Sequence, residues 1–194
     1  MESLKFRIEG VSPLVMHNGR LADPLDEYVR KIKEVSGKRM KTDADHEEMA
    51  RLEWYGGLYL KDGRPCIPGF VMEATLIGKG GAARKMKMGK QAAAALIVEN
   101  DAPLEYAGPK DPTALWQDTQ YRLRTKVNIN GSSVIRTRPI FFPWAAEIEI
   151  LFLPELLNRD MVIQWMDIAG SESGLMDWRP KFGRFTAALL NGQG

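Results

Sequence analysis

The sequence predicts an α+β domain whose strands and helices follow the order βαββαβ, with a helical insertion at about 20–56 and a β-hairpin at about 119–142. Alternating apolar and polar residues indicate the strands, and apolar residues three or four positions apart indicate the helices. An Asn-Gly pair between two runs of β-branched residues indicates the hairpin. With 194 residues, 44% of them hydrophobic, the chain can form one large domain with its own core.

The N-terminal part predicts a strand followed by the helical insertion. Apolar and charged residues alternate over 4–9, as in a strand with one buried face. Asp23 followed by Pro24 is a favourable helix start, because Asp can cap the helix and Pro fits its first turn. Helical spacing then continues to Gly37. A second helix is expected over 43–55.

The middle of the chain predicts a helix, a loop and a buried segment. Residues 70–77 have a small-residue face at helical spacing. Residues 78–89 contain four glycines among their cations, so this segment is expected to be a mobile loop rather than a stable helix. Residues 92–99 are expected to form a buried strand or short helix, and the Leu-Ile-Val run at 96–98 favours the strand.

The hairpin is the strongest local signal. Residues 121–129 and 133–141 flank Asn130 and Gly131. In the first arm, apolar residues and Thr125 are expected on one face. The other face is expected to carry the polar residues Arg122, Arg124, Lys126 and Asn128. The ribbon is therefore expected to present its cations along one face.

Three further elements complete the order. A strand is expected over 145–153, a helix over about 162–169, and a last strand over 185–190. With the insertion and the hairpin set aside, the order is βαββαβ, the ferredoxin-like or split βαβ unit. The same unit underlies the RNA-recognition domain, so an RRM-like fold is predicted.

The sequence also indicates the cellular compartment of the protein. No apolar run approaches the roughly 18–20 residues of a membrane span. The first ten residues alternate charged and apolar side chains, unlike a signal peptide. The lone Cys66 has no partner for an internal disulfide, which favours a reducing compartment. We expect a cytoplasmic protein with no membrane partner.

Signals for catalysis are weak. The sequence has no phosphate-loop, nucleophile-elbow or paired-histidine motif, so we expect no enzyme activity, no catalytic residue and no cofactor. His17 has no visible partner and is interpreted as a loop residue. One group of possible metal ligands lies at the start of the second expected helix: Asp43, Asp45, His46, Glu47 and Glu48. A run of acids also suits a helix N-terminus, and we prefer that interpretation and expect no metal.

Basic residues are concentrated in three stretches. The chain has 27 Lys and Arg residues against 25 Asp and Glu, so it is nearly neutral as a whole. The stretches 79–90, 121–138 and 178–184 nevertheless hold 13 of these cations and no acid. Basic patches interleaved with Gly, Asn, Ser and an aromatic residue suit a polyanion backbone, most commonly that of nucleic acid.

Each stretch supplies candidate contacts. A basic ribbon can follow a phosphate backbone, and Arg136 and Arg138 lie two residues apart on one side of a strand, where each can bind a phosphate. Trp178 is a candidate platform for base stacking. The predicted nucleic-acid-binding residues are Arg84, Lys85, Lys87, Arg122, Arg124, Lys126, Arg136, Arg138, Trp178, Arg179, Lys181 and Arg184.

Each basic stretch can also be explained without nucleic acid. Cations on an edge strand also deter aggregation, and residues 79–90 can be an ordinary surface loop. The aromatic residues of 174–185 can complete the core, and for Phe185 we prefer this interpretation.

Several landmarks together resemble a known family. An N-terminal strand runs into Ser12-Pro13-Leu14, and Ile67-Pro68-Gly69 precedes a small-residue helix. A basic hairpin follows, and a glycine-bracketed segment at 174–185 precedes the last strand. These features resemble the repeat-associated mysterious protein (RAMP) superfamily, in particular the backbone subunits of CRISPR effector complexes. The Arg-Thr-Arg-Pro stretch at 136–139 is also similar to stand-alone phage proteins.

The resemblance implies a ferredoxin-like palm with the hairpin as a projecting thumb. It implies subunits that assemble as homo-oligomers or filaments along single-stranded RNA, or with other subunits of a CRISPR-type complex. Family members often follow Ile-Pro-Gly with Ser residues and a Lys that contact guide RNA, whereas this chain has Phe70-Val71-Met72-Glu73. Some relatives cleave RNA with an Asp after the first strand, a place that corresponds to Asp23.

The sequence thus predicts a sequence-tolerant protein that binds single-stranded nucleic acid, RNA in preference to DNA. Two alternatives stay open. One is a metal-dependent ribonuclease that uses Asp23, which we interpret first as a helix cap. The other is a phage protein-interaction module that acts on a host CRISPR complex.

Overall fold

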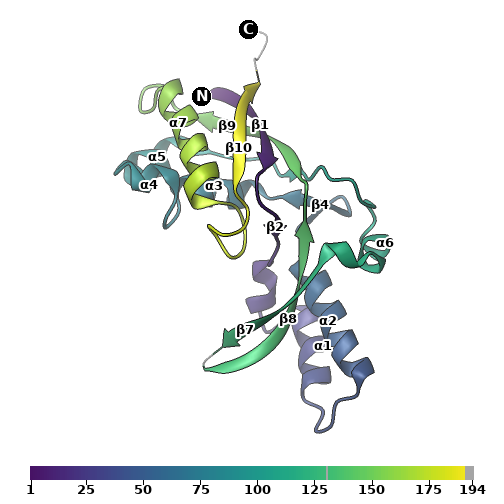
Figure 1. The fold of residues 1–194 in the computed structure, drawn as a ribbon. Helices are drawn as coiled ribbons and strands as arrows, with labels where there is room; N and C mark the ends of the chain where they lie inside the picture. The colour runs from purple at the N-terminus through teal and green to yellow at the C-terminus, as the bar shows by residue number, and fades with distance from the viewer. Residues whose placement is uncertain (130, 191–194) are drawn as a thin grey trace.

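The computed structural model describes residues 1–129 and 131–190 and combines helices with antiparallel sheets (Figure 1), which confirms the predicted α+β class. The central sheet has the strand order β10-β1-β9-β5. These strands are β1 (Glu2–Gly10), β5 (Leu96–Ile97), β9 (Ala145–Phe152) and β10 (Phe185–Leu190). Because each neighbouring pair is antiparallel, β1 and β5 run in the same direction with β9 between them.

One face of the central sheet forms the core. In β1, Leu4, Phe6 and Ile8 are buried while the charged residues between them point the other way, as the alternation predicts. Helices α3 (Gly69–Ile77) and α7 (Arg159–Ile168) lie beside this sheet (Figure 1). The helix α7 runs into a short π-helical turn, η3 (Ala169–Ser173).

The opposite face of the central sheet is charged. Arg7 donates two hydrogen bonds to Glu105, of 2.5 and 2.8 Å, and also lies within 4.0 Å of Glu147. Lys5 lies 3.9 Å from Glu149 on the neighbouring strand. Acids therefore outnumber cations in this group of contacts.

The insertion is a pair of helices that extends from the body of the molecule (Figure 1). It contains the 3-10 turn η1 (Gly19–Ala22), α1 (Glu27–Ser36) and α2 (Asp43–Gly57). The predicted start of the first helix is wrong. Asp26 caps α1 by accepting a hydrogen bond from the Tyr28 amide (2.9 Å).

Helix α2 begins as the acidic run predicts. Thr42 and Asp45 form a reciprocal capping box, with Asp45 accepting from the Thr42 amide (3.0 Å). Lys38 Nζ lies 2.5 Å from Asp45 Oδ1. The hydrogen bonds from Lys38 and from the Thr42 backbone lower the pKa of Asp45 to about 2.

The glycine-rich segment is not the loop that its composition predicts. It contains the short helix α4 (Ala82–Lys85), and α5 (Gly89–Ala95) begins at its last residue. The segment 92–99, predicted as a buried strand or short helix, contains the end of α5 and then β5. The alanines of α4 and α5 are small enough to be buried, including Ala82 and Ala92. At Gly81 a side chain is excluded, because a Cβ atom there would lie 2.7 Å from the Leu76 carbonyl oxygen. Packing of small residues therefore outweighs the low helix propensity of glycine.

The predicted hairpin is confirmed. It consists of β7 (Arg122–Ile129) and β8 (Ser132–Phe141), and the base of β8 also pairs with β2 (Leu14–Val15). The hairpin projects from the body beside α1 and α2 (Figure 1). Asn130 lies outside the described residues, and Gly131 has the positive φ of 80° expected in such a turn.

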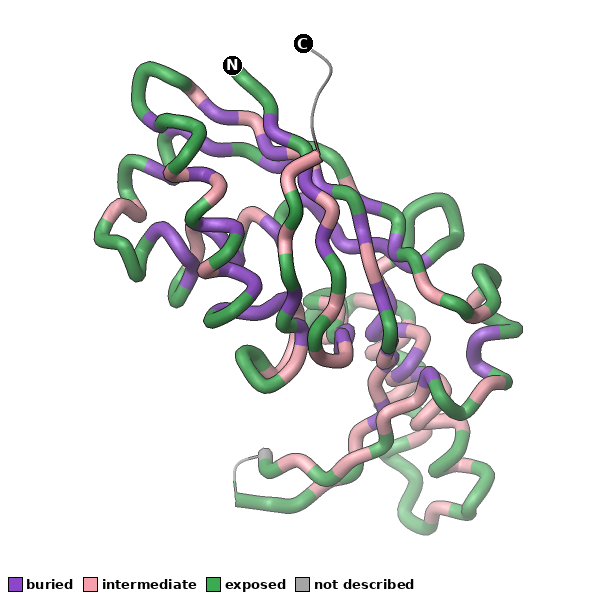
Figure 2. Tube along the Cα trace, turned by 45° about the horizontal axis from the view of Figure 1, so that its top comes forward, coloured by how far each residue is buried: buried purple, intermediate pink, exposed green. Residues whose placement is uncertain are grey.

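A buried tryptophan fixes α2 to the base of the hairpin. The indole nitrogen of Trp54, which is fully buried, donates to the Tyr121 carbonyl (2.8 Å). The ring packs 5.4 Å from that of Trp116 in α6 (Pro112–Gln117), which is followed by the short turn η2 (Thr119–Tyr121). Figure 2 shows the buried segments concentrated in the body, whereas the hairpin beyond this base is mostly exposed or intermediate.

A third, small sheet has the order β3-β4-β6. Its strands are β3 (Leu60–Lys61), β4 (Arg64–Ile67) and β6 (Ala102–Pro103). It leads directly into α3, whose first amide, that of Gly69, donates to Asp101 (2.9 Å). Within residues 1–129 and 131–190, every helix is too short or too polar to cross a bilayer.

Candidate nucleic-acid interface

The register of the hairpin divides its cations between two faces. Side chains that lie directly opposite each other share a face of an antiparallel pair. Arg124 lies opposite Thr137, and Lys126 lies opposite Ile135. Arg136 and Arg138, by contrast, lie opposite Thr125 and Leu123 and share the other face. The prediction of a ribbon with all its cations on one face is wrong, because this register joins even-numbered residues of β7 to odd-numbered residues of β8.

We call the first of these surfaces the Arg124 face; it comprises Arg122, Arg124, Lys126 and Ile135. Arg124 and Lys126 are exposed, and neither forms an ion pair with another described residue. Ile135 is 52% exposed and lies beside Lys126. Arg122 is held at the base of the hairpin, with its guanidinium 4.1 Å from the centre of the Trp116 ring. This face therefore offers two free cations beside an apolar side chain.

The Arg124 face borders a cleft of about 540 Å³ between the hairpin and α2. Arg122, Arg124 and Thr137 line one side of it. His46 and the acids Asp43 and Glu47 line the α2 side. The charge of this cleft is therefore mixed, and its cations lie on the hairpin.

On the second face, Arg136 is already paired. Its Nη1 lies 2.6 Å from Glu53 Oε1, and the other carboxylate oxygen of Glu53 accepts the Thr137 amide (3.0 Å). Glu53 therefore neutralises Arg136 and also satisfies a backbone amide on the outer edge of β8.

Arg138 on the same face is also paired. Its Nη1 lies 3.1 Å from Asp177 Oδ2, close enough for an ion pair although not aligned as a hydrogen bond. Its guanidinium covers the ring of Trp178 at 4.9 Å. Burial lowers the pKa of Arg138, while the charges of Asp177 and Glu53 oppose this effect.

His17 lies close to these groups, a proximity that its sequence context does not indicate. It lines a cleft of about 360 Å³ with Arg136 and Arg138, and a smaller one of about 200 Å³ with Arg179. Burial lowers the pKa of His17, and the charge of Arg138 lowers it further. These effects outweigh the charge of Asp177, which raises the pKa, and so favour the neutral imidazole.

The segment 174–184, here called the terminal glycine loop, closes on itself. Gly183 (φ 73°) accepts a hydrogen bond from the Leu175 amide (2.9 Å) and donates to the Pro13 carbonyl (2.8 Å). A Cβ atom at Gly183 would lie 2.0 Å from the Leu175 carbonyl oxygen, so this close approach requires glycine.

The cations of the terminal glycine loop point outward. Arg179, Lys181 and Arg184 are exposed. Lys181 lies 5.4 Å from the centre of the Phe182 ring, and Arg184 Nε donates to the Pro180 carbonyl (2.8 Å). Trp178 is covered on one side by Arg138, so its predicted use as a platform must involve its remaining surface.

The first basic stretch supplies fewer free cations than its sequence indicates. Arg84 Nε donates to the Ile77 carbonyl (3.0 Å), and Lys85 pairs with Glu172 (2.9 Å). Lys87 is exposed and has a positive φ of 63°. Ser173, just before the terminal glycine loop, donates to the Gly80 carbonyl (3.1 Å). Contacts therefore link the first stretch to η3, and the Arg138–Asp177 pair links the second stretch to the terminal glycine loop.

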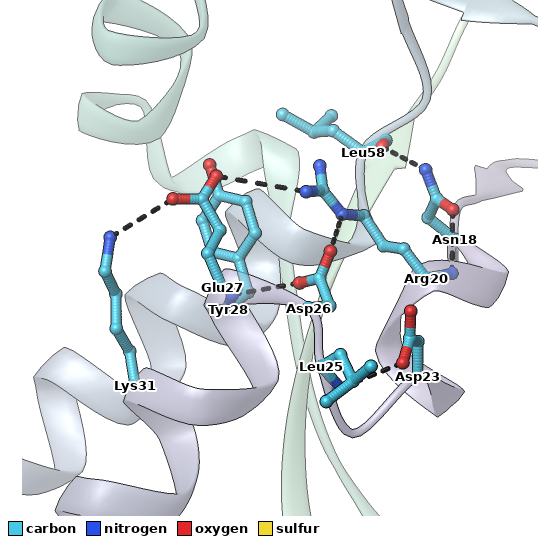
Figure 3. Close-up of polar contacts among 9 residues, drawn as sticks. All are labelled: Asn18, Arg20, Asp23, Leu25, Asp26, Glu27, Tyr28, Lys31 and Leu58. Atoms are coloured by element: carbon cyan, nitrogen blue, oxygen red, sulfur yellow. Dashed lines mark hydrogen bonds and ion pairs between the residues drawn. The ribbon is translucent and has the colours of Figure 1, made fainter.

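Asp23, the residue of the ribonuclease alternative, lies exposed before α1 (Figure 3). Its carboxylate accepts the Leu25 amide (2.8 Å). Nearby, desolvation raises the pKa of Asp26, but hydrogen bonds from Arg20 and the Tyr28 amide outweigh it and lower the pKa overall. In the part of the chain that the structure describes, no three His, Cys, Asp or Glu side chains are grouped as metal ligands.

No protein-family model matches this sequence, and no curated protein is significantly similar to it. The resemblance to the RAMP superfamily stays a prediction.

Proposed function

We propose that the protein binds single-stranded nucleic acid through the Arg124 face and the terminal glycine loop. The observation that carries this proposal is the pair of exposed cations, Arg124 and Lys126, on a hairpin that projects from the body. Such a ribbon can follow a phosphate backbone without reading base edges, so binding is sequence-tolerant and strongly dependent on salt.

The strand order supports a ferredoxin-like palm. β1, α3 and β5 form one βαβ unit split by β9, and β9, α7 and β10 form a second one split by β1. In this proposal the helical insertion follows the first strand of the palm, and the hairpin is the thumb between its second and third strands.

The charged face of the central sheet argues for contact through the hairpin. RNA-recognition domains stack bases on the open face of their sheet. Here that face carries Glu147, Glu149 and the Arg7–Glu105 pair, whose acids repel phosphate. The bound nucleic-acid strand therefore avoids this face of the sheet and follows the hairpin.

The preference for RNA, and assembly along the strand or within a ribonucleoprotein complex, rest on the resemblance to RAMP proteins. That resemblance depends mainly on Ile67-Pro68-Gly69 and the terminal glycine loop. No observation favours the ribonuclease or protein-interaction alternatives over binding.

Removal of the two free thumb cations tests the proposal. We expect Arg124→Ala combined with Lys126→Ala to weaken binding of single-stranded oligonucleotides of different sequence to a similar degree. Each phosphate contact contributes about 0.7 to the slope of log affinity against log salt for single strands, so the slope should fall by about 1.4. Filter binding over a range of salt concentrations measures both effects.

The matched control is Lys5→Ala combined with Arg159→Ala, which removes the same charge from exposed positions outside the proposed interface. Equal affinity and equal salt slope for the two double variants would contradict the assignment of the thumb.

A further inference from the structure

A small cleft between α3 and the terminal glycine loop has the features of a ligand site. Its volume is about 200 Å³, and its wall includes His17, Tyr59, Phe70, Met176, Asp177 and Arg179. This volume is below the roughly 300–1,000 Å³ of sites for drug-sized ligands, and it suits a single ring system. We call it the Phe70 cleft. Only Arg179 of these six residues belongs to the basic contacts that the sequence predicts.

Phe70 presents an open aromatic surface in this cleft. It is the second residue of α3 and is 63% exposed, whereas Met72 and Leu76 of the same helix are fully buried. Tyr59 packs edge-on against it, with ring centres 6.0 Å apart and planes at 70°. The Tyr59 hydroxyl in turn donates to the His17 carbonyl (3.3 Å), which fixes the tyrosine. An exposed ring that is braced in this way can stack on a planar ligand.

Polar groups of both kinds surround the ring. Arg179 is exposed and supplies a cation, while His17, which is also exposed, supplies an imidazole. Asp177 supplies a carboxylate whose side chain is 25% exposed, although its Oδ2 is buried against Arg138 (3.1 Å). Nucleobase edges carry both donors and acceptors, and each base is followed by a phosphate. The groups in the cleft match this combination better than they match a purely apolar or purely anionic ligand.

The backbone beside the cleft is held in an uncommon conformation. Met176 and Trp178, on either side of Asp177, have positive φ values of 62° and 54°. Non-glycine residues in this region are strained and occur often at ligand clamps. The Asp177 amide donates to the Val15 carbonyl (3.0 Å), so the strained segment is tied to β2 and keeps the carboxylate at the cleft.

We propose that the Phe70 cleft holds one unstacked nucleobase of the bound strand. The base lies on the ring of Phe70, its edge meets Asp177 and His17, and Arg179 binds the adjoining phosphate. This inference rests on the proposed function and adds a stacking site to it. Because every base has a π-face, the site accepts different bases and preserves sequence tolerance.

Photocross-linking tests the position of the base. A short single-stranded oligonucleotide that carries 5-iodouridine is bound, irradiated and digested, and the modified peptide is identified by mass spectrometry. We expect the cross-link at Phe70 or Tyr59. Stacking on one aromatic side chain contributes a roughly 5- to 150-fold factor in affinity, so Phe70→Ala should weaken binding by this factor and Phe70→Trp should restore it.

The control is Phe142→Ala, which removes another exposed phenylalanine that does not line the cleft. Unchanged affinity of Phe70→Ala and cross-links at other residues would overturn the Phe70 cleft, while weakening by Arg124→Ala with Lys126→Ala would still support the proposed function. A wild-type protein that binds no single strand would overturn both.

Discussion

Glu53 connects α2 to β8. Its partners, Arg136 and Thr137, lie 83 and 84 positions away in the chain. Its side chain is 11% exposed and serves the Arg136 guanidinium and the Thr137 amide at the same time. Without this carboxylate, a partly buried guanidinium and an edge amide of β8 would both lose their partner. Removing a carboxylate that satisfies two partly buried donors in this way costs stability, because both donors lose their partner.

We therefore expect Glu53→Ala to lower the free energy of unfolding by about 1–3 kcal/mol. Glu53→Gln should cost less, because an amide oxygen can still accept from the Thr137 backbone. Urea denaturation followed by tryptophan fluorescence measures the difference. Glu47→Ala, an exposed change on the same helix, is the control, and an equal effect of Glu47→Ala and Glu53→Ala would refute this role for Glu53.

The same contacts make Arg136 and Arg138 poor tests of binding. Their removal leaves Glu53 or Asp177 without a partner, so lost affinity would be mixed with lost stability. Arg124 and Lys126 separate the two effects, because no described acid depends on them.

At the level of elements, the cap of α2 makes a pH-dependent contribution to stability. The pKa of Asp45 falls from 3.8 in the unfolded chain to about 2 in the folded protein, mainly because of the Lys38 hydrogen bond. A lowered pKa stabilises the fold above pH 4 and loses this effect as the pH falls through 2.

We expect Asp45→Asn to melt at a lower temperature than the wild type at pH 6, and the difference to shrink between about pH 4 and pH 2. Lys38→Ala should reproduce most of the difference, because it removes the dominant partner. Circular dichroism melts at several pH values provide the measurement. A difference that persists at pH 2 would show that the ion pair is not its cause.

Local patterns predicted some elements and missed others for identifiable reasons. β1 and the hairpin follow from alternation and from the Asn-Gly signal, because both depend on neighbouring residues. α4 did not, because its buried alanines stabilise it through packing against other helices. At α5 the pattern predicts either a buried strand or a short helix, and the chain forms the helix up to Ala95. The start of α1 was misplaced because Asp26 had the same capping ability as Asp23.

The candidate site was predictable only in part. The exposure of Arg124, Lys126, Arg179 and Lys181 agrees with the concentration of charge along the sequence. The two-face division of the hairpin depends on its register, and the pairing of Arg136 and Arg138 depends on acids in other elements. His17, Tyr59 and Phe70 carry no shared sequence signal, because their proximity exists only in the folded chain.

At the level of the whole molecule, the proposed function predicts the size and nucleic-acid content of the purified protein. If it coats a strand, size-exclusion chromatography with light scattering should give large particles with a raised absorbance ratio at 260 to 280 nm. Nuclease should reduce them to the protein alone, and separate treatments with ribonuclease and deoxyribonuclease identify the strand. A nucleic-acid-free monomer would instead favour the protein-interaction alternative.

The covered edge of β8 limits how copies of this protein can add to one another. Open-ended stacking of strands needs two free edges on every copy, as in cross-β fibres. Here α2 lies along β8, and Glu53 occupies its Thr137 amide, while β7 is the outermost strand of its sheet. Two copies can pair through their β7 edges. A third copy finds no free edge along this part of the hairpin, because β8 is covered. The hairpin can therefore extend into solvent without seeding fibre growth there.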